Sequence, residues 1–340
     1  MPINKNISES IDLLRVIACF LVVTLHSSAI WFYSFSDFWW KVNIIDSLTR
    51  VSVPLFIMIT GVLLINEKNI DYSTIPKRIT RAIKIIFFWS AIYYLTYSEK
   101  NINIIDFIYK AIFNDIKFHF WYLYALIGFY ISIPILSSVY KNSNSKTIFI
   151  IILLWSISSN VELLSFFIPS LYSVKYIYNI EFLSNFIGYL ILGKLLSDIF
   201  LGGSVKIKSL YLFALYFAFS TLTAFATYII SNNKEPNLLF YSYTSPMTII
   251  ASSFIFLFIL KSTAHVNNAF KKKIKTIANL TLGIYCIHIL ILEKLSLTIM
   301  NKISIDNGFS YMLLLSMVTF VISLSIIYIL KKIKPIEKLV

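Results

Sequence analysis

The chain has 340 residues, of which 58% are hydrophobic and only 14% are charged, whereas charged residues make up about 25% of soluble domains. Together with a mean hydropathy of +0.78, this composition excludes an ordinary soluble protein and predicts an integral membrane protein. The net charge of +14 does not require a nucleic-acid partner, because positive residues are retained beside anionic lipid on the cytoplasmic face of a membrane. Membrane lipids are therefore the expected partners, and nucleic acid is not.

Ten apolar segments are long enough to cross a bilayer, which takes about 20 residues of helix. They lie at residues 11–31, 44–66, 81–98, 118–140, 147–167, 183–201, 209–231, 240–262, 277–297 and 311–331. The predicted fold class is all-α, a polytopic membrane helical bundle of about ten transmembrane helices. No linker or low-complexity stretch interrupts the pattern, so residues 1–340 are predicted to form a single integral-membrane domain.

The basic residues set the predicted orientation, because lysine and arginine are retained on the cytoplasmic side. With both termini cytoplasmic, the cytoplasmic segments hold 20 basic residues and the outer segments hold 7, while Arg15, Arg50 and Lys294 fall within apolar segments. We therefore expect a multi-pass protein of the inner (cytoplasmic) cell membrane. Cys19 and Cys286 both lie inside apolar segments, so neither a disulfide framework nor a metal site is expected.

The first apolar segment carries an arginine and a histidine on one helix face. His26 lies eleven residues after Arg15. At about 100° and 1.5 Å per residue, the two side chains point within about 20° of each other and lie about 16 Å apart along the axis. A central arginine costs about 2.5–3.5 kcal/mol in a membrane, so the pair is a candidate functional site. Alternatively, Arg15 could snorkel to the interface and pair with Asp12, while His26 bonds to a neighbouring helix.

Arginine is rare in this chain, and all four arginines among the 30 basic residues lie within the first 81 positions. A guanidinium offers several donors to phosphate or carboxylate, so retained arginines are candidates for anion binding. Arg78 and Arg81 share a helix face just after Pro76, at a helix start whose free N–H groups also attract anions. They form a candidate phosphate site, with a positive-inside cluster as the alternative. Arg50 and Asp46 have the spacing of an intrahelical ion pair.

Five short sequence blocks occur in the order found in one known family. They are Arg15 followed by ten residues and His26; Val53-Pro54-Leu-Phe56 through Thr60-Gly61; Arg78-x-x-Arg81; His119-x-Trp121 through Pro134; and Gly283-Ile-Tyr285-Cys-Ile-His288. In this order they resemble membrane acyltransferase family three, multi-helix O-acyltransferases whose motifs include R-x10-H, RxxR and G-I-Y-L-x-H. The second block departs from the family pattern in having Thr60 where serine is commoner. The resemblance spans about 280 residues.

The resemblance implies acyl transfer from cytoplasmic acyl-CoA, usually acetyl-CoA, to a hydroxyl at or across the membrane. The chain resembles the stand-alone members, including those that acetylate enterobacterial common antigen and other surface polysaccharides. A glycan or lipid-linked sugar is therefore the expected acceptor, acetyl-CoA is the expected donor substrate, and no permanently bound cofactor or metal is expected. The competing classes are an exporter or flippase of such a glycan, and a structural partner in polysaccharide synthesis.

Thioester chemistry then assigns expected roles to the residues that match the family. The attacking hydroxyl needs a base, and the developing oxyanion needs hydrogen-bond donors. We predict that His26 is the base, because burial disfavours its charged form, and a transient acyl-His26 is the second route. Arg15, nearer the cytoplasm, is predicted to hold the pantetheine or pyrophosphate end of the donor, or to orient the thioester carbonyl. Arg78 and Arg81 are predicted to bind the CoA phosphates.

Two further blocks supply candidates for the acceptor side. His119 and Trp121 are predicted at the outer end of the 118–140 helix, where an acceptor sugar could stack on the indole ring. Anchoring in the interfacial aromatic belt is the alternative for Trp121. Tyr285 and His288 are further candidates for acceptor binding, with hydrogen bonds between packed helices as their alternative role.

Overall fold

The computed structural model describes residues 5–33, 35, 38–65, 72–98, 102–113, 116–177, 185–231, 235–300 and 308–340, and within these ranges the regular structure is entirely helical. The helices are α1 (Lys5–Phe32), α2 (Trp39–Thr49), α3 (Ser52–Leu64), α4 (Thr74–Tyr97), α5 (Ile104–Ile112), η1 (Phe118–Phe120), α6 (Trp121–Lys141), α7 (Ser145–Ser159), α8 (Val161–Phe167), α9 (Leu171–Ile177), α10 (Ile187–Leu201), α11 (Ser209–Ile230), η3 (Leu239–Tyr241), α12 (Pro246–Ser262), η4 (Thr263–His265), α13 (Asn268–Ala278), α14 (Thr281–Met300) and α15 (Gly308–Leu330). The all-helical membrane fold class is confirmed.

By length and composition, six helices in the described residues could cross a membrane, or up to eight if two bent helix pairs each count as one span. The bent pairs are α7 with α8, at 54°, and α13 with α14, at 60°. The expected segments 81–98 and 183–201 also fall largely on helices, but basic residues in the first half of α4 lower its hydropathy and α10 has only 15 residues. Residue 66 and residues 183–184 of the expected segments lie outside the described ranges. The count of about ten and the cytoplasmic termini stay predictions.

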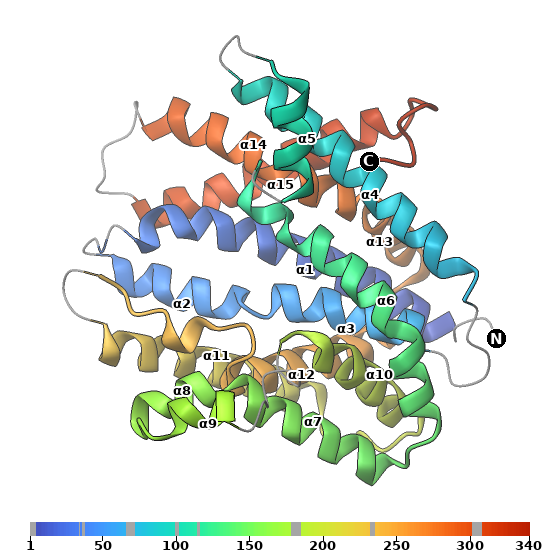
Figure 1. Cartoon of the computed structure of the whole chain (residues 1–340), viewed down its shortest axis with the longest axis vertical. Coiled ribbons are helices and arrows are strands. Elements are labelled where there is room, and N and C mark those ends of the chain that lie inside the picture. Colours follow the sequence, from blue (N-terminus) through green and yellow to red (C-terminus); the bar gives the residue numbers. More distant parts are fainter. Residues whose placement is uncertain are drawn as a thin grey trace.

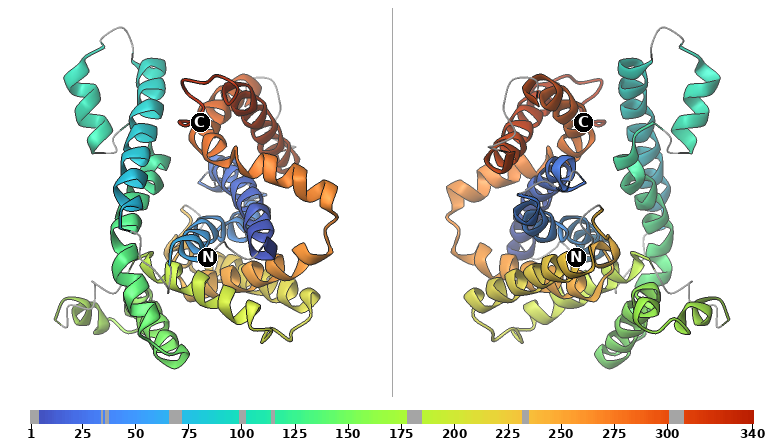
Figure 2. Two further views of the ribbon diagram at one scale, coloured as in Figure 1. Left: turned by 90° about the vertical axis from the view of Figure 1, so that its right-hand side faces the viewer. Right: turned by 90° about the vertical axis from the view of Figure 1, so that its left-hand side faces the viewer.

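Helix α1 lies at the centre of the bundle. It contacts α2, α3, α12, α13, α14 and α15, so its side chains are surrounded by segments from most of the chain. Figure 1 shows α14 and α15 on one side of α1, and α10, α11 and α12 on the other. Helices α4 and α6 form a flank of the bundle, with α5 on its outer side (Figure 2). A residue on α1 can therefore meet groups from the first and the last quarter of the chain.

The span from Trp39 to Leu64 is interrupted between α2 and α3. Pro54 stands in the first turn of α3, where its missing N–H is tolerated, but it cannot donate to the carbonyl of Arg50 as a continuous helix requires. Helix α2 accordingly ends at Thr49, with Arg50 as its C-cap residue. The interruption places the Arg50 side chain inside the bundle rather than at the end of a span.

Helices α3 and α10 cross with their backbones in direct contact. A Cβ atom added to Gly61 would lie 1.9 Å from the carbonyl oxygen of Leu190, and one added to Gly193 would lie 2.4 Å from the carbonyl oxygen of Met58. Both positions therefore require glycine, in the manner of small-residue helix contacts in membranes. Gly128 of α6 differs, because a Cβ atom there would meet nothing within 4 Å.

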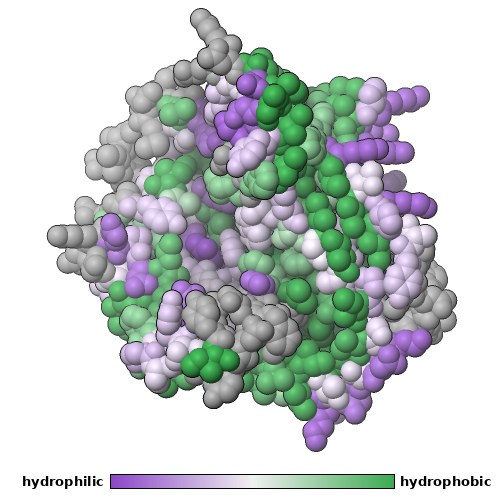
Figure 3. Space-filling view, in the orientation of Figure 1, coloured by the Kyte–Doolittle hydropathy of each residue, from purple (hydrophilic) through white to green (hydrophobic). Residues whose placement is uncertain are grey.

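The face seen in Figure 3 is mainly hydrophobic over α4 and α6, and hydrophilic side chains gather toward the right-hand rim. Hydrophobic side chains such as Leu95, Ile131 and Ile135 are exposed there, at 59–67% of their surface. Lipid covers such a surface without cost, because the exposed side chains are apolar and helices satisfy their own backbone groups. The exposed apolar surface of the flank agrees with a location in a membrane.

Candidate active site

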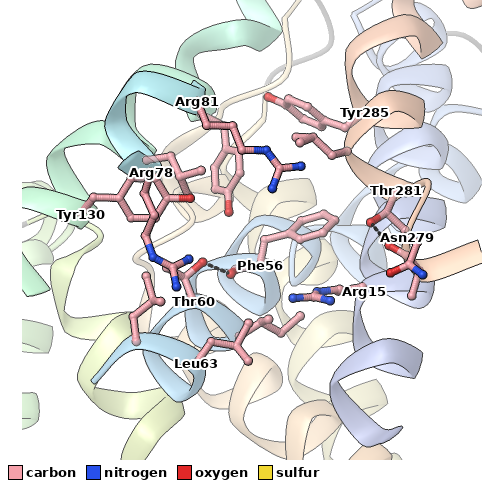
Figure 4. Close-up of a pocket in the computed structure, with 16 residues that line it drawn as sticks. Arg15, Phe56, Thr60, Leu63, Arg78, Arg81, Tyr130, Asn279, Thr281 and Tyr285 are labelled. Atoms are coloured by element: carbon pink, nitrogen blue, oxygen red, sulfur yellow. Dashed lines mark hydrogen bonds between the residues drawn. The ribbon is translucent and has the colours of Figure 1, made fainter. Parts of the chain in front are cut away.

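Three of the four arginines line one pocket (Figure 4). Arg15 comes from α1, and Arg78 and Arg81 come from the first turns of α4. The pocket has a volume of about 350 Å³ and is also lined by Phe56, Ile59, Thr60, Leu63, Leu64, Tyr122, Leu126, Tyr130, Ala278, Asn279, Thr281, Leu282 and Tyr285. In Figure 4 the three guanidinium groups point into the same space from different walls. The pocket is therefore suited to an anionic ligand.

Arg15 both pairs with Asp12 and lines a candidate site, the two arrangements that the sequence analysis gave as alternatives. Its Nη1 lies 3.5 Å from Oδ1 of Asp12, one helical turn earlier, and its side chain is 32% exposed. The same side chain borders the pocket that holds Arg78 and Arg81. The ion pair with Asp12 holds the guanidinium at the pocket wall, and Figure 4 shows it directed toward the space that Arg78 and Arg81 also face.

Three histidines from distant parts of the chain meet beside this pocket. Nδ1 of His26 on α1 lies 2.8 Å from Nε2 of His288 on α14. The ring of His119, from η1, lies 6.4 Å from that of His26 and 5.3 Å from that of His288. The structure thus gives His26 a partner that its position in the sequence did not indicate.

The hydrogen bonds assign the protons of the His26–His288 pair. Nδ1 of His288 lies 2.6 Å from the carbonyl oxygen of Tyr285, which can only accept, so this nitrogen carries a proton. In neutral His288 the other nitrogen, Nε2, must then accept a hydrogen bond from Nδ1–H of His26. Nε2 of His26 is left unprotonated on a half-buried side chain. This is the protonation state that a general base requires.

His119, like His288, is more enclosed than the other candidates for the acceptor side. It is only 1% exposed, and its Nε2 lies 3.3 Å from the carbonyl oxygen of Cys286, which also accepts from the Tyr93 hydroxyl at 3.0 Å. Its Nδ1 is buried and has no hydrogen-bond partner within the described part of the chain. The geometry places His119 behind His26 and His288, where it packs against both rings.

Tyr285 joins the arginine pocket to the histidines. Its side chain lines the pocket, its hydroxyl donates to the backbone carbonyl of His119, and its own carbonyl holds His288. One residue of α14 therefore contacts the pocket and two of the three histidines. Among the described residues, no three His, Cys, Asp or Glu side chains are placed to hold a metal ion.

An ion pair next to His26 completes the site. Asp46 is 1% exposed and its Oδ2 accepts from Nη2 of Arg50 at 2.6 Å and from Nε at 3.2 Å. The hydroxyl of Ser28, two residues after His26, donates to Oδ1 of Asp46 at 2.9 Å. The sequence indicated the Asp46–Arg50 spacing, but it gave no sign of Ser28 or of Tyr241 and Tyr243 beside the guanidinium. Tyr241 ends the short helix η3, and Tyr243 follows in an irregular segment before α12.

Comparison with known proteins identifies the family. The sequence model of the family described as "Acyltransferase domain", of the acyltransferase-3 type, matches residues 8–328. An "Amino-acid racemase" of Enterococcus faecalis is 31% identical over 133 residues, which cover 36% of this chain and 18% of that protein. The chain thus spans less than a fifth of the length of that relative. No solved structure matches the present chain. The arginine pocket and all three histidines of the cluster lie within the range that the family model matches. Because that match covers nearly the whole chain, the chain belongs to the acyltransferase-3 family of membrane acyltransferases.

Proposed function

We propose that this protein transfers an acetyl group from cytoplasmic acetyl-CoA to a hydroxyl group of a cell-surface or lipid-linked glycan. The observation that carries the proposal is the series of contacts that runs from the arginine pocket through Tyr285 to His288 and His26. An anion-binding cavity and an unprotonated imidazole nitrogen are the two features that transfer from a CoA thioester needs.

The arginines bind the donor in this proposal. Arg78 and Arg81 are exposed at the pocket wall and take the phosphate groups of CoA, for which forked guanidinium groups are well shaped. Arg15 lies on the same helix as His26, about 16 Å away along the axis. A flexible pantetheine arm spans that separation, so the thioester reaches the histidines while the phosphates stay with the arginines.

His26 performs the proton transfers. Its Nε2 removes the proton of the acceptor hydroxyl as the oxygen attacks the thioester carbonyl and forms the new C–O bond. The C–S bond then breaks, and the imidazolium returns the proton to the departing CoA sulfur. His288 stabilises the imidazolium by accepting its Nδ1–H, and Tyr285 keeps His288 in the tautomer that can accept. His288 is thus a positioning residue.

A covalent route uses the same residues. Nε2 of His26 attacks the thioester carbonyl, the C–S bond breaks and CoA leaves as the thiolate. The acetyl group then passes from the imidazole to the acceptor oxygen, and the proton of the acceptor hydroxyl ends on the CoA sulfur. The two routes differ in one observable: only the covalent route places acetyl label on the protein when acceptor is absent. A label on wild-type protein that is missing from His26→Ala identifies the covalent route, and transfer without such a label identifies the general-base route.

The test is reconstitution of the full chain in lipid vesicles with radiolabelled acetyl-CoA and the envelope glycan fraction of the source cell. We expect the wild type to label the glycan, His26→Ala to lose the activity, and His265→Ala to keep it. His265 is the matched control because it is exposed in η4, outside the histidine cluster. A glycan exporter would move the glycan without acquiring label from acetyl-CoA, and equal labelling by His26→Ala would remove the assignment of the base.

A further inference from the structure

A second group of polar and aromatic side chains lies next to His26 and outside the arginine pocket. Its centre is the Asp46–Arg50 pair, in which Asp46 holds one edge of the guanidinium and Ser28 holds the other carboxylate oxygen. Arg50 donates two of the five N–H groups of its guanidinium to this contact, Nε–H and one Nη2–H. The Tyr243 hydroxyl takes a further hydrogen bond from the guanidinium, and the Arg50 side chain is 16% exposed, which leaves up to two N–H groups for a ligand.

Two aromatic rings lie against this guanidinium, and two more continue the series of ring contacts away from it. The ring centres of Tyr241 and Tyr243 lie 4.4 and 5.5 Å from the Arg50 guanidinium carbon. The Tyr243 ring stacks near the Trp121 indole at 6.3 Å, and Trp121 packs against Phe186 at 5.2 Å. Tyr243, Trp121 and Phe186 are half-buried, so packing within the protein does not use all of their ring surface.

Contacts, together with two steps of two residues along the chain, link a ring of residues that starts and ends at His26. In one direction, Ser28 leads from α1 to Asp46 and Arg50 on α2, and then to Tyr243 and Trp121. In the other, Trp121 follows two residues after His119, whose ring lies 6.4 Å from that of His26. Figure 3 shows the surface hollowed left of centre, over α1 and α2, with hydrophilic atoms inside the hollow.

We propose that Trp121, Tyr243 and Arg50 form the acceptor subsite, and that its ligand is an uncharged sugar ring. This inference rests on the proposed function and names the place and chemistry of its second substrate. Aromatic faces bind the apolar faces of a ligand ring, and a few fixed polar groups orient it. The N–H groups of Arg50 bind ring hydroxyls. Asp46 cancels the charge of Arg50, so the site selects hydroxyl groups rather than a carboxylate or phosphate.

The experiment separates the two substrates of the reconstituted enzyme. Glycan transfer is measured as a function of glycan concentration, and acetyl-CoA binding is measured separately by equilibrium dialysis. We expect Trp121→Ala to raise the KM for the glycan about tenfold or more, because one aromatic stacking contact is lost. Trp121→Phe keeps a ring and should stay within about threefold of wild type. Acetyl-CoA affinity should change less than about twofold in both variants, because Trp121 does not line the arginine pocket.

Trp40→Ala is the matched control, because Trp40 is a tryptophan of α2 that is 53% exposed and lies outside this ring of residues. An unchanged glycan KM in Trp121→Ala overturns the subsite. A loss of acetyl-CoA binding as large as the loss of glycan binding also overturns it, because it indicates a structural role for Trp121. Arg50→Lys should also raise the glycan KM, and raising the salt from about 50 to 500 mM should leave the wild-type KM unchanged. If the wild type transfers no acetyl group, the proposed function itself is refuted. If the wild type is active and Trp121→Ala leaves the glycan KM unchanged, only the subsite is refuted.

Discussion

The hydrogen bond between His26 and His288 predicts that their substitutions are strongly coupled. Each histidine is replaced by alanine, alone and together. His26→Ala removes the base, which is worth about 10²–10⁴-fold in rate. His288→Ala leaves the base in place but removes the acceptor that fixes its Nδ1–H at 2.8 Å. His26 can then rotate and take the other tautomer.

The size of the His288 effect follows from its position behind the base. Groups that orient a reactive histidine through its second nitrogen typically contribute about 10–100-fold, or about 1.4–2.7 kcal/mol. Once His26 is absent, His288 has nothing to orient. The double variant should therefore be as slow as His26→Ala alone, and the coupling energy should equal the full effect of His288→Ala, about 1.4–2.7 kcal/mol.

The assay is the initial rate of label transfer from acetyl-CoA to glycan at saturating donor, for the four members of the cycle and for the His265→Ala control. His288→Gln is a useful sixth protein, since its amide oxygen can accept the same hydrogen bond and should recover part of the rate. Multiplicative losses in the double variant would refute the reasoning, because they would mean that the two histidines act independently. Acetyl-CoA binding by each protein shows that the pocket is intact.

Two further predictions concern the donor pocket and the helix crossing. Arg78→Lys and Arg81→Lys keep the charge and lose the fork, so each should raise the KM for acetyl-CoA about tenfold with little change in kcat, while Lys77→Ala on the exposed face should not. An unchanged KM would contradict a phosphate role. Gly61→Ala places a Cβ atom against a backbone carbonyl and should destabilise the protein by about 2 kcal/mol or more, seen as a lower thermal midpoint in detergent, whereas Gly128→Ala should have no such effect. Equal midpoints would show that α3 and α10 can separate at no cost.

The sequence predicted the parts of the site that depend on local spacing. Arg15 and His26 share a face of α1 because eleven residues make about three turns. Arg78 and Arg81 share a face of α4 for the same reason. The rarity of arginine singled out these residues, and three of the four arginines do meet in one pocket. Their roles in binding the donor stay predictions.

The partners of these residues could not be predicted, because they depend on how distant helices pack. His26 and His288 are 262 positions apart, and no periodicity within either helix indicates their contact. Tyr243 reaches Arg50 from a segment between η3 and α12 that has no helical repeat to interpret. For the same reason, a hydropathy window cannot tell a straight span from the 60° bend between α13 and α14.

Because Tyr285 makes three contacts, a substitution there affects the arginine pocket and the histidine cluster together. Loss of the phenol ring removes part of the pocket wall and the hydroxyl that binds the His119 carbonyl, and a shift of the α14 backbone at this residue moves the carbonyl that fixes the tautomer of His288. A change at Tyr285 that suits a different ligand in the pocket therefore also alters how His119 and His288 are held.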